Sequence, residues 1–389
     1  MSPSSFLHLH EPQAPSLQPE GMPMPWAMAA DSSAWSGSAV KVRPLGCTVM
    51  VKLITSVSLS VVSFVVVIGR GLRRFITGLI LPSNLNPLGA LPARFRRQRV
   101  LIVGCGDVGL RVARLLPASV NVMALTSTSA RLPELRGCGI MPLLGNLDNS
   151  AGLKRLAGLA THVVHLAPPP NDDPHGRTDP RTQALLRALR LRSAPQAIVY
   201  GSTSGVYGDC QGLLIDETRR VNPGTSRAHR RVDAEAQLRW FGRSAGVPIH
   251  ILRIPGIYAP DREGGTPRGR LAKGIPTLTA SDDVYTNHIH ADDLARACLA
   301  ALRRGKPQRI TNASDDTDLK MGDYFDLAAD LYGLPRPPRL ARQDAKAQLP
   351  AMQLSFMSES RRLDNQRLKR ELRVKLRYPT VREGLKDDS

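Results

Sequence analysis

Short runs of consecutive hydrophobic residues recur between residues 100 and 254, and they alternate with segments whose hydrophobic residues lie three and four positions apart. A continuous apolar run is typical of a strand that is buried on both faces of a parallel sheet. The pattern predicts six such strands, at residues 100–103, 120–125, 140–144, 162–167, 197–200 and 249–254. The segments with helical spacing predict helices at residues 108–116, 132–136, 151–159, 182–191, 228–241 and 294–302.

Residues that start or stop helices support these boundaries. Pro117 ends the first predicted helix, Gly137 ends the second, and Asn149 or Ser150 is the expected N-cap of the third. Strands that alternate with helices at this spacing are typical of the α/β class. The sequence therefore predicts a doubly wound parallel sheet.

The chain before residue 96 follows neither pattern. Residues 1–42 are rich in Pro, Ser, Met and Ala and predict disorder. Residues 48–69 are almost uncharged and precede three arginines, at positions 70, 73 and 74. They fit either a single anchor in the inner membrane, with the rest of the chain in the cytoplasm, or an extension that is not part of the working protein. We therefore expect an extension at residues 1–95, a main domain at 96–315 and a C-terminal lobe at 316–389.

Composition narrows the choice of partners. The net charge is +20, but the cations are spread along the chain, and aromatic residues make up only 4% of it. This does not resemble a nucleic-acid surface, which gathers cations and stacking rings, so an anionic small molecule is favoured over nucleic acid. The five cysteines are scattered and form no C-x-x-C pair. They favour a reducing, cytoplasmic compartment and argue against a disulfide framework or a zinc site.

A glycine pattern directly follows the first predicted strand and opens the first helix, as Gly104-x-Gly106-x-x-Gly109. Gly104 would allow the tight turn, Gly106 would let backbone amides approach phosphates, and Gly109 would let the helix pack closely on the strand. In this context the pattern is typical of a Rossmann dinucleotide-binding domain. We expect the whole turn to hold the pyrophosphate of NAD or NADP: Gly104, Cys105, Gly106, Asp107, Val108 and Gly109.

The next two strand ends refine the cofactor prediction. NAD-binding domains usually place an acid after the second strand, whereas here Thr126 and Arg131 lie in a segment without one. This favours NADP over NAD, although Arg131 also fits a solvated helix residue. Ala167 ends the fourth strand and Pro168 begins a rigid lip along which the cofactor would lie, so both are expected to bind it.

Hydroxyl groups follow the fifth strand, in the segment YGSTSGVYGD at residues 200–209. Side chains at the carboxyl end of a parallel strand face the ligand crevice. Thr203 and Ser204 are therefore candidate substrate-binding residues. The alternative is a loop of hydroxyls that cap the backbone.

Five motifs together resemble the extended short-chain dehydrogenase/reductase superfamily, which includes the NAD-dependent epimerases and dehydratases of nucleotide sugars. They are GCGDVG, HVVHLAPPP, YGSTSGVYGD, LRIPGIYAP and HIHADDLARA, and the similarity extends over residues 99–385. The resemblance implies a Rossmann domain and a small C-terminal substrate lobe, to which residues 256–281 contribute. It also implies that Thr203 contacts the reacting substrate oxygen, and that the protein can form a homodimer through the helices after the fourth and fifth strands.

The catalytic pair of that superfamily is missing. Its members carry Tyr-x-x-x-Lys on the helix after the fifth strand, usually followed by a Glu. Counting back from Glu235 puts Arg231 at the Lys position and Arg227 at the Tyr position. An arginine keeps its proton at neutral pH and cannot serve as an acid or base. Both arginines instead suit a phosphate or carboxylate, or are surface residues.

No other residue is a convincing substitute for the tyrosine. His229 would point to a different helix face, Tyr207 fits a structural turn, and His165 fits a core residue. His288, His290, Asp292 and Asp293 resemble a metal cluster, but the acids precede a helix whose N-terminus they would cap. We expect no metal site there.

The leading hypothesis is therefore an NAD(P)-dependent oxidoreductase of the epimerase/dehydratase type, acting on a sugar-like or anionic small molecule. The competing hypothesis is a non-catalytic NAD(P)-binding sensor or scaffold, which the missing catalytic pair favours. Either could be cytoplasmic, or membrane-anchored through residues 48–69.

Overall fold

The computed structural model describes residues 49–56, 59–68, 71–72, 97–170, 175–350, 354–355 and 357–386. The chain divides into two compact units, Met1–Ala90 and Leu91–Ser389. In the first unit, β1 (Val49–Ser56) pairs antiparallel with β2 (Leu59–Ile68), which pairs with β3 (Gly71–Leu72). These strands occupy the segment that was considered as an anchor. No helix among the described residues is long and apolar enough to cross a membrane. Residues 1–42, where disorder was predicted, lie outside the described part.

The second unit is built on a seven-stranded sheet in which every strand pair is parallel, in the order β15-β10-β8-β7-β4-β5-β6. The strands are β4 (Arg99–Val103), β5 (Asn121–Thr126), β6 (Met141–Leu144), β7 (His162–His165), β8 (Ala197–Thr203), β10 (Ile249–Ile254) and β15 (Arg309–Asn312). The predicted doubly wound parallel sheet is confirmed. The direction of winding reverses between β4 and β7, and ligands of such sheets bind in the crevice at this point.

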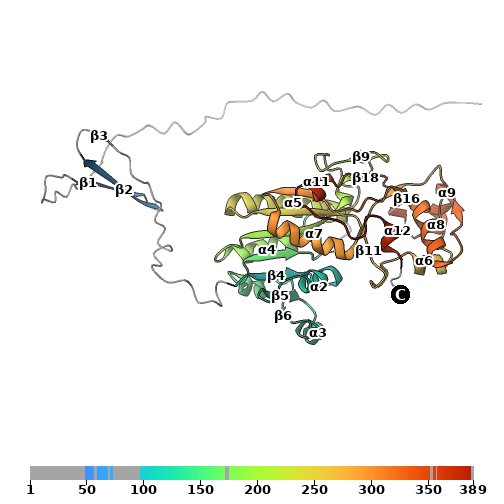
Figure 1. Ribbon diagram of the computed structural model, residues 1–389, viewed down its shortest axis with the longest axis horizontal. Coiled ribbons are helices and arrows are strands. Elements are labelled where there is room, and N and C mark those ends of the chain that lie inside the picture. Colours follow the sequence, from blue (N-terminus) through green and yellow to red (C-terminus); the bar gives the residue numbers. More distant parts are fainter. Residues whose placement is uncertain are drawn as a thin grey trace, which may run out of the picture. The chain divides into compact units, whose positions relative to one another are not determined.

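Helices cover both faces of this sheet (Figure 1). They are α2 (Asp107–Arg114), α3 (Leu132–Gly137), the 3₁₀ segment η3 (Ser150–Leu156), α4 (Pro180–Arg190), α5 (Ser226–Ala245) and α7 (Ala291–Arg304). Alternate residues of β4 face opposite cores: Val100 and Ile102 pack in the core beneath α2 and α7, whereas Leu101 and Val103 pack in the core beneath α4 and α5. Burial on both faces explains why the strand sequences are uninterrupted apolar runs.

Three details differ from the sequence-based expectation. The edge strand β15 was not predicted, and the third helical segment is a 3₁₀ segment, capped by Asn149, whose side chain accepts a hydrogen bond from Ala151 N. The N-cap of α7 is His290, whose Nδ1 accepts from Asp292 N at 3.2 Å, so the capping role given to Asp292 and Asp293 was wrong. Asp293 instead accepts the backbone N–H groups of Arg377 and Tyr378 and holds the C-terminal segment against α7.

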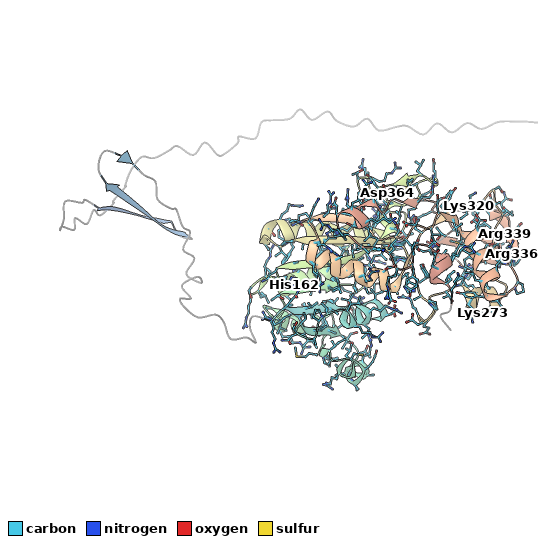
Figure 2. The ribbon with its side chains drawn as sticks, in the orientation of Figure 1. His162, Lys273, Lys320, Arg336, Arg339 and Asp364 are labelled. Carbon is cyan, nitrogen blue, oxygen red and sulfur yellow. The ribbon has the colours of Figure 1, made fainter. Side chains whose placement is uncertain are left out.

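A small lobe with its own core lies beyond one end of the sheet (Figure 1). Its helices are α6 (Arg268–Ala272), α8 (Met321–Tyr332), α9 (Arg342–Gln348) and α12 (Val381–Gly384). Its short strands are β12 (Thr277–Leu278), β13 (Tyr285–Thr286), β16 (Leu319–Lys320) and β17 (Arg339–Leu340). Lys273, Lys320, Arg336 and Arg339 mark its position in Figure 2. The paired strands β11 (Gly256–Tyr258) and β14 (His288–His290) run between the sheet and this lobe.

The remaining elements join the C-terminal segment to the sheet. They are η4 (Ser204–Tyr207), β9 (Leu214–Ile215), β18 (Arg362–Leu363) and α11 (Gln366–Arg370), and β9 pairs with β18 in parallel.

Candidate functional site

The glycine turn between β4 and α2 can be built only with glycine at its first position. Gly104 has a φ of +85°, and a Cβ there would lie 2.3 Å from the backbone N of Ala167. A Cβ on Gly109 would lie 3.2 Å from Gly104 O, so the helix packs closely on the turn. A Cβ on Gly106 would meet nothing within 4 Å. The turn is thus tight against the sheet and open on the side of Gly106.

A cleft of about 400 Å³ opens over this turn, at the point where the direction of winding reverses. Its lining includes Gly104, Gly106, Asp107, Val108, Gly109, Pro168 and Pro169. Gly106 is the N-cap of α2 and supplies no side-chain cap, so the first-turn N–H groups are left for another acceptor. The positive end of the helix dipole adds to this preference for an anion. The turn fits the pyrophosphate of a dinucleotide.

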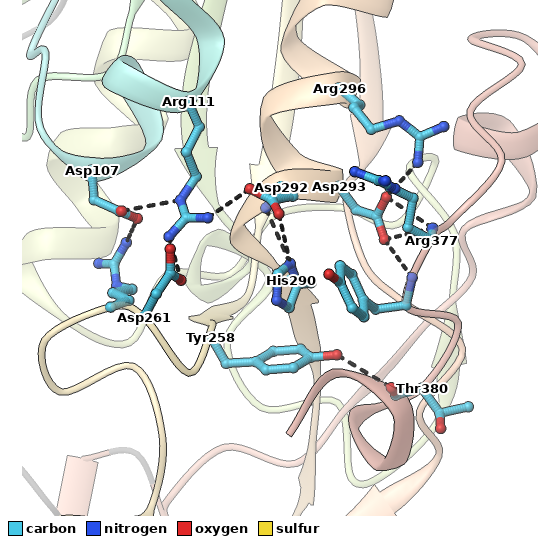
Figure 3. Close-up of polar contacts among 12 residues, drawn as sticks. Asp107, Arg111, Tyr258, Asp261, His290, Asp292, Asp293, Arg296, Arg377 and Thr380 are labelled. Atoms are coloured by element: carbon cyan, nitrogen blue, oxygen red, sulfur yellow. Dashed lines mark hydrogen bonds and ion pairs between the residues drawn. The ribbon is translucent and has the colours of Figure 1, made fainter. Parts of the chain in front are cut away.

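A group of five paired charges borders the cleft (Figure 3). Arg111, whose side chain is 7% exposed, contacts Asp107 at 3.0 Å, Asp261 at 2.6 Å and Asp292 at 2.6 Å. These carboxylates raise the pKa of Arg111, and its guanidinium in turn lowers the pKa of Asp261. Arg262 Nη1 lies 2.9 Å from Asp107 Oδ2 and also lines the cleft. These pairs hold the loop after β11 against the start of α2.

The residues expected at the adenosine end lie beside the turn. Arg131 Nη1 donates to Cys105 O at 2.7 Å, and its other nitrogens contact both carboxylate oxygens of Glu134. Burial raises the pKa of the Cys105 thiol to about 11, so this side chain is a packed neutral group. Thr126 is buried at the end of β5, where its Oγ1 accepts from Thr128 N at 3.3 Å.

A second cavity, of about 450 Å³, adjoins the first and reaches toward the small lobe. The two cavities share four lining residues: Thr203, Arg227, Pro255 and Ile257. Ser204, which is 5% exposed, lines the second cavity only. The shared residues place the end of β8 and the start of α5 at the junction of the two spaces.

The residues at the positions of the missing catalytic pair both line the cofactor cleft, and one of them also lines the second cavity. Arg227 lines both cavities, whereas Arg231, expected on the substrate side, lines only the cleft with the glycine turn. Arg231 Nη1 donates to Tyr200 OH at 3.0 Å and to Gly201 O at 2.7 Å. Arg231 is therefore held against β8 as a fixed positive charge.

A buried polar network beneath the cleft was not predicted. Ser202 Oγ donates to Glu235 Oε1 at 2.7 Å, and Arg253 Nη2 lies 2.8 Å from Glu235 Oε2. The Glu235 and Arg253 side chains are 1% and 3% exposed. The network joins β8, α5 and β10, so it orients the helix that carries Arg227 and Arg231. An arginine inside the apolar run of β10 was the signal in the sequence, because a buried arginine needs a partner.

The other candidate side chains have structural contacts. His165 Nε2 lies 3.0 Å from Thr182 Oγ1, and burial lowers the pKa of His165 to about 3, which keeps it neutral. Tyr207 OH donates to Asn312 Oδ1 at 2.7 Å, and burial raises the pKa of Tyr207 to about 12. Neither residue lines the cleft or the second cavity. Within the described ranges, no group of three or more His, Cys, Asp or Glu side chains is arranged to hold a metal ion.

Residues 100–314 match the sequence model of the NAD dependent epimerase/dehydratase family. The chain belongs to this family. Family members bind a nicotinamide cofactor, in agreement with the predicted use of the glycine turn. The resemblance drawn from the five motifs is thereby confirmed.

The individual relatives of the chain are distant. It is 26% identical to Protein YeeZ of Escherichia coli K12 over 253 residues, which are 62% of this chain and 86% of that one. A functionally unknown conserved protein from Silicibacter pomeroyi is 31% identical, with a TM-score of 0.62 over 74% of this chain and 96% of that chain. UDP-glucuronic acid 4-epimerase from Bacillus cereus, solved with UDP-glucuronic acid and NAD, is 18% identical, with a TM-score of 0.59 over 74% and 96% of the two chains. The last likeness shows the fold alone.

Proposed function

We propose that this protein is an NAD(P)-dependent oxidoreductase of the epimerase/dehydratase type that acts on a sugar-like or anionic small molecule. The observation that carries the proposal is the pair of adjoining cavities. One contains the glycine turn, the other extends to the small lobe, and Thr203 and Arg227 line both. A substrate in the second cavity would meet the dinucleotide at these two side chains. The nucleotide-sugar enzymes of this family support a sugar-like substrate.

The cofactor, when bound, supplies hydride exchange, and the chain supplies its binding site. The amides of the first turn of α2, which follows Gly106, would bind the pyrophosphate, while Pro168 and Pro169 border its path. Arg231, fixed on Tyr200 and Gly201, brings a positive charge to the same cleft. It takes the place of the family's lysine as a cation but not as a group that transfers protons.

Thr203 is the proposed contact to the reacting oxygen of the substrate. Its Oγ1 already accepts the N–H of Gly205 at 3.2 Å, so its hydroxyl hydrogen is left to donate to a carbonyl or alkoxide oxygen. Arg227, at the same junction, stabilises negative charge that develops on that oxygen. Neither side chain accepts a proton at neutral pH. A proton that the substrate loses therefore passes to water, and a proton that it gains comes from water.

A non-catalytic NAD(P)-binding sensor or scaffold is the second candidate function. The replacement of both the tyrosine and the lysine by arginine favours it, because none of the four described residues at the junction is a general acid or base. The two candidates differ in one measurable respect, since only the enzyme oxidises or reduces a bound substrate. The homodimer and the cytoplasmic location stay predictions under both.

The first test is a titration of the full-length chain with NADPH and with NADH, followed by nicotinamide fluorescence. Saturable binding is expected, and binding of neither at millimolar concentration would exclude both candidate functions. With the tighter cofactor, oxidation and reduction of a panel of nucleotide sugars, sugar phosphates and keto acids are then measured. Thr203→Ala should reduce turnover, with the exposed Thr218→Ala as its matched control. Turnover that Thr203→Ala leaves unchanged would refute the proposed site, and absence of turnover with tight cofactor binding would favour the sensor.

The preference for NADP is tested at Arg131. The 2′-phosphate that distinguishes NADPH from NADH would be repelled by the carboxylate introduced in Arg131→Glu. The affinity for NADPH should therefore fall by about tenfold or more, while that for NADH changes little. Arg136→Glu makes the same charge change within α3, the helix whose N-cap is Arg131, and should leave both affinities in place. Equal losses of affinity for NADPH and NADH in Arg131→Glu would contradict the predicted preference for NADP.

A further inference from the structure

An arginine in the wall of the second cavity lacks the partners that buried arginines normally have. Arg270 lies on α6 and lines the cavity. Its Nε and Nη2 atoms are buried and donate no hydrogen bond, and none of the described carboxylates forms an ion pair with it. Its guanidinium packs on the ring of Phe325, whose centroid lies 4.5 Å from Cζ. The positive charge is thus buried on one side and uncompensated.

Such an arrangement is costly, and the neighbouring arginine shows how it is usually avoided. Arg361 lines the same cavity and is paired, since its Nη1 lies 2.7 Å from Glu359 Oε2 and donates to Gly208 O at 2.9 Å. Burial lowers the pKa of Arg270, which is the direction expected where no anion stabilises the charge. Buried polar groups without partners are rare in native proteins and often indicate a missing ion or ligand.

The other side chains of the cavity do not provide the missing negative charge. Among the described residues that line it, the ionised ones are three arginines and one carboxylate, and that carboxylate, Glu359, is paired with Arg361. His288 is neutral, because burial lowers its pKa to about 3. The cavity therefore carries excess positive charge, which an uncharged sugar would leave uncompensated.

We propose that Arg270 forms an anion subsite in the second cavity, and that it binds an oxyanion of the substrate, either a carboxylate or a phosphate. Both groups match the planar charge of a guanidinium, and either would provide the negative charge that the described lining residues do not supply to Arg270. The subsite rests on the proposed function in that it treats this cavity as the substrate cavity. It deepens that function, because it selects charged substrates over neutral sugars.

The test measures oxyanion binding to the full-length chain without cofactor. Sodium phosphate and sodium acetate are titrated at a constant ionic strength held with sodium chloride, and binding is read by calorimetry and by the shift in the unfolding temperature. A saturable response to one of the two anions is expected, and which one responds identifies the group as phosphate or carboxylate. Arg270→Gln should weaken this binding by about tenfold or more, since it removes a charge-assisted hydrogen-bonding group.

Two further variants make the result decisive. Lys273→Gln removes the same charge from an exposed position three residues along the chain and should bind the anion as the wild type does. Arg270→Lys retains the charge without the fork and should bind with intermediate strength, and it serves if Arg270→Gln does not fold. The proposal is overturned if neither anion binds more tightly than chloride, or if Arg270→Gln and Arg270→Lys bind as the wild type does.

Failure of the subsite and failure of the proposed function are distinguishable. NADPH and NADH binding is measured on the same variants, and it should be unchanged because Arg270 does not line the cofactor cleft. Anion binding without any cofactor binding would retain the subsite and refute the oxidoreductase. Cofactor binding without an anion response at Arg270 would refute the subsite alone.

Discussion

The charged side chains around the glycine turn are paired with one another, whereas one in the wall of the second cavity has no ionic partner among the described residues. Around the glycine turn, the charged side chains hold one another: Arg111 has three carboxylate partners, and Arg262 is paired with Asp107. In the second cavity, Nε and Nη2 of Arg270 are buried without a hydrogen-bond partner among the described residues. A dinucleotide is bound mainly by backbone amides, so its site can be complete before the ligand arrives. A side-chain site for a particular substrate keeps a group that only that substrate satisfies.

The difference also affects which substitutions each region tolerates. A site made by backbone geometry tolerates many side chains as long as the turn is preserved. A site that depends on one unpaired guanidinium loses its selectivity when that single residue changes. Substitutions in the two regions should therefore differ in their effects, and four of them test this difference.

The largest effect is expected from Gly104→Ala. The new methyl group would lie 2.3 Å from Ala167 N, in a backbone conformation with a φ of +85° that alanine rarely adopts. The turn must move, so NADPH and NADH binding should be lost, and backbone strain and overpacking together should lower the free energy of unfolding by about 5 kcal/mol. Gly137→Ala is the control, because a Cβ there meets nothing within 4 Å. Normal cofactor titrations of Gly104→Ala would contradict a site made by this turn.

The next effect is a change in pH dependence from Asp315, which lies just after β15 and donates its backbone N–H to His288 O at 2.8 Å. Burial raises the pKa of Asp315 to about 7, from 3.8 in a model peptide. Between these values the folded protein keeps a proton that the unfolded chain has lost, so this group lowers the free energy of unfolding as pH rises from about 4 to about 7. The full change is roughly 4 kcal/mol.

Asp315→Asn should remove that contribution, because an amide has no proton to lose. The free energy of unfolding is measured for both proteins from pH 4 to pH 8, and the variant should gain stability relative to wild type across this range. The buried histidines His165 and His288, whose pKa values are lowered to about 3, act oppositely but are present in both proteins. A constant difference across the range would show that Asp315 ionises normally.

Arg111→Met tests the paired side of the comparison. It leaves Asp107, Asp261 and Asp292 close together without their shared cation. Removing one member of a buried pair is strongly destabilising, but Asp261 is 65% exposed and partly screened, so we expect a loss of about 2 kcal/mol. Urea unfolding measures it, with the exposed Arg114→Met on the same helix as the control. Equal stability of the two variants would mean that the charge group contributes little.

The sequence predicted one of these regions much better than the other, for a physical reason. The glycine turn and the strand Ile249–Ile254 are local patterns, and their bounds follow from neighbouring residues. The strand β15 has the sequence Arg-Ile-Thr-Asn and lies at the edge of the sheet. Because its ends are polar, it has no continuous apolar run by which it could be predicted. Arg270 lies on a five-residue helix, and its ring partner Phe325 comes from another helix far along the chain. No local pattern in the sequence encodes that contact, so the second cavity could be recognised only in the folded structure.

The smallest effect has the opposite sign to the one at Arg111. Arg270→Met replaces a buried, unpaired guanidinium by an apolar chain of similar length that can still pack on Phe325. The variant loses a cation–π contact but no longer desolvates a charge, so its free energy of unfolding should rise by about 1 kcal/mol in the absence of ligand. The same urea experiment measures this gain, with Lys273→Met as the control. A loss of stability as large as that of Arg111→Met would mean that Arg270 already has a partner in the folded chain, and the contrast between the two cavities would disappear. A gain accompanied by loss of anion binding would show that the fold gives up stability to keep this charge for a ligand.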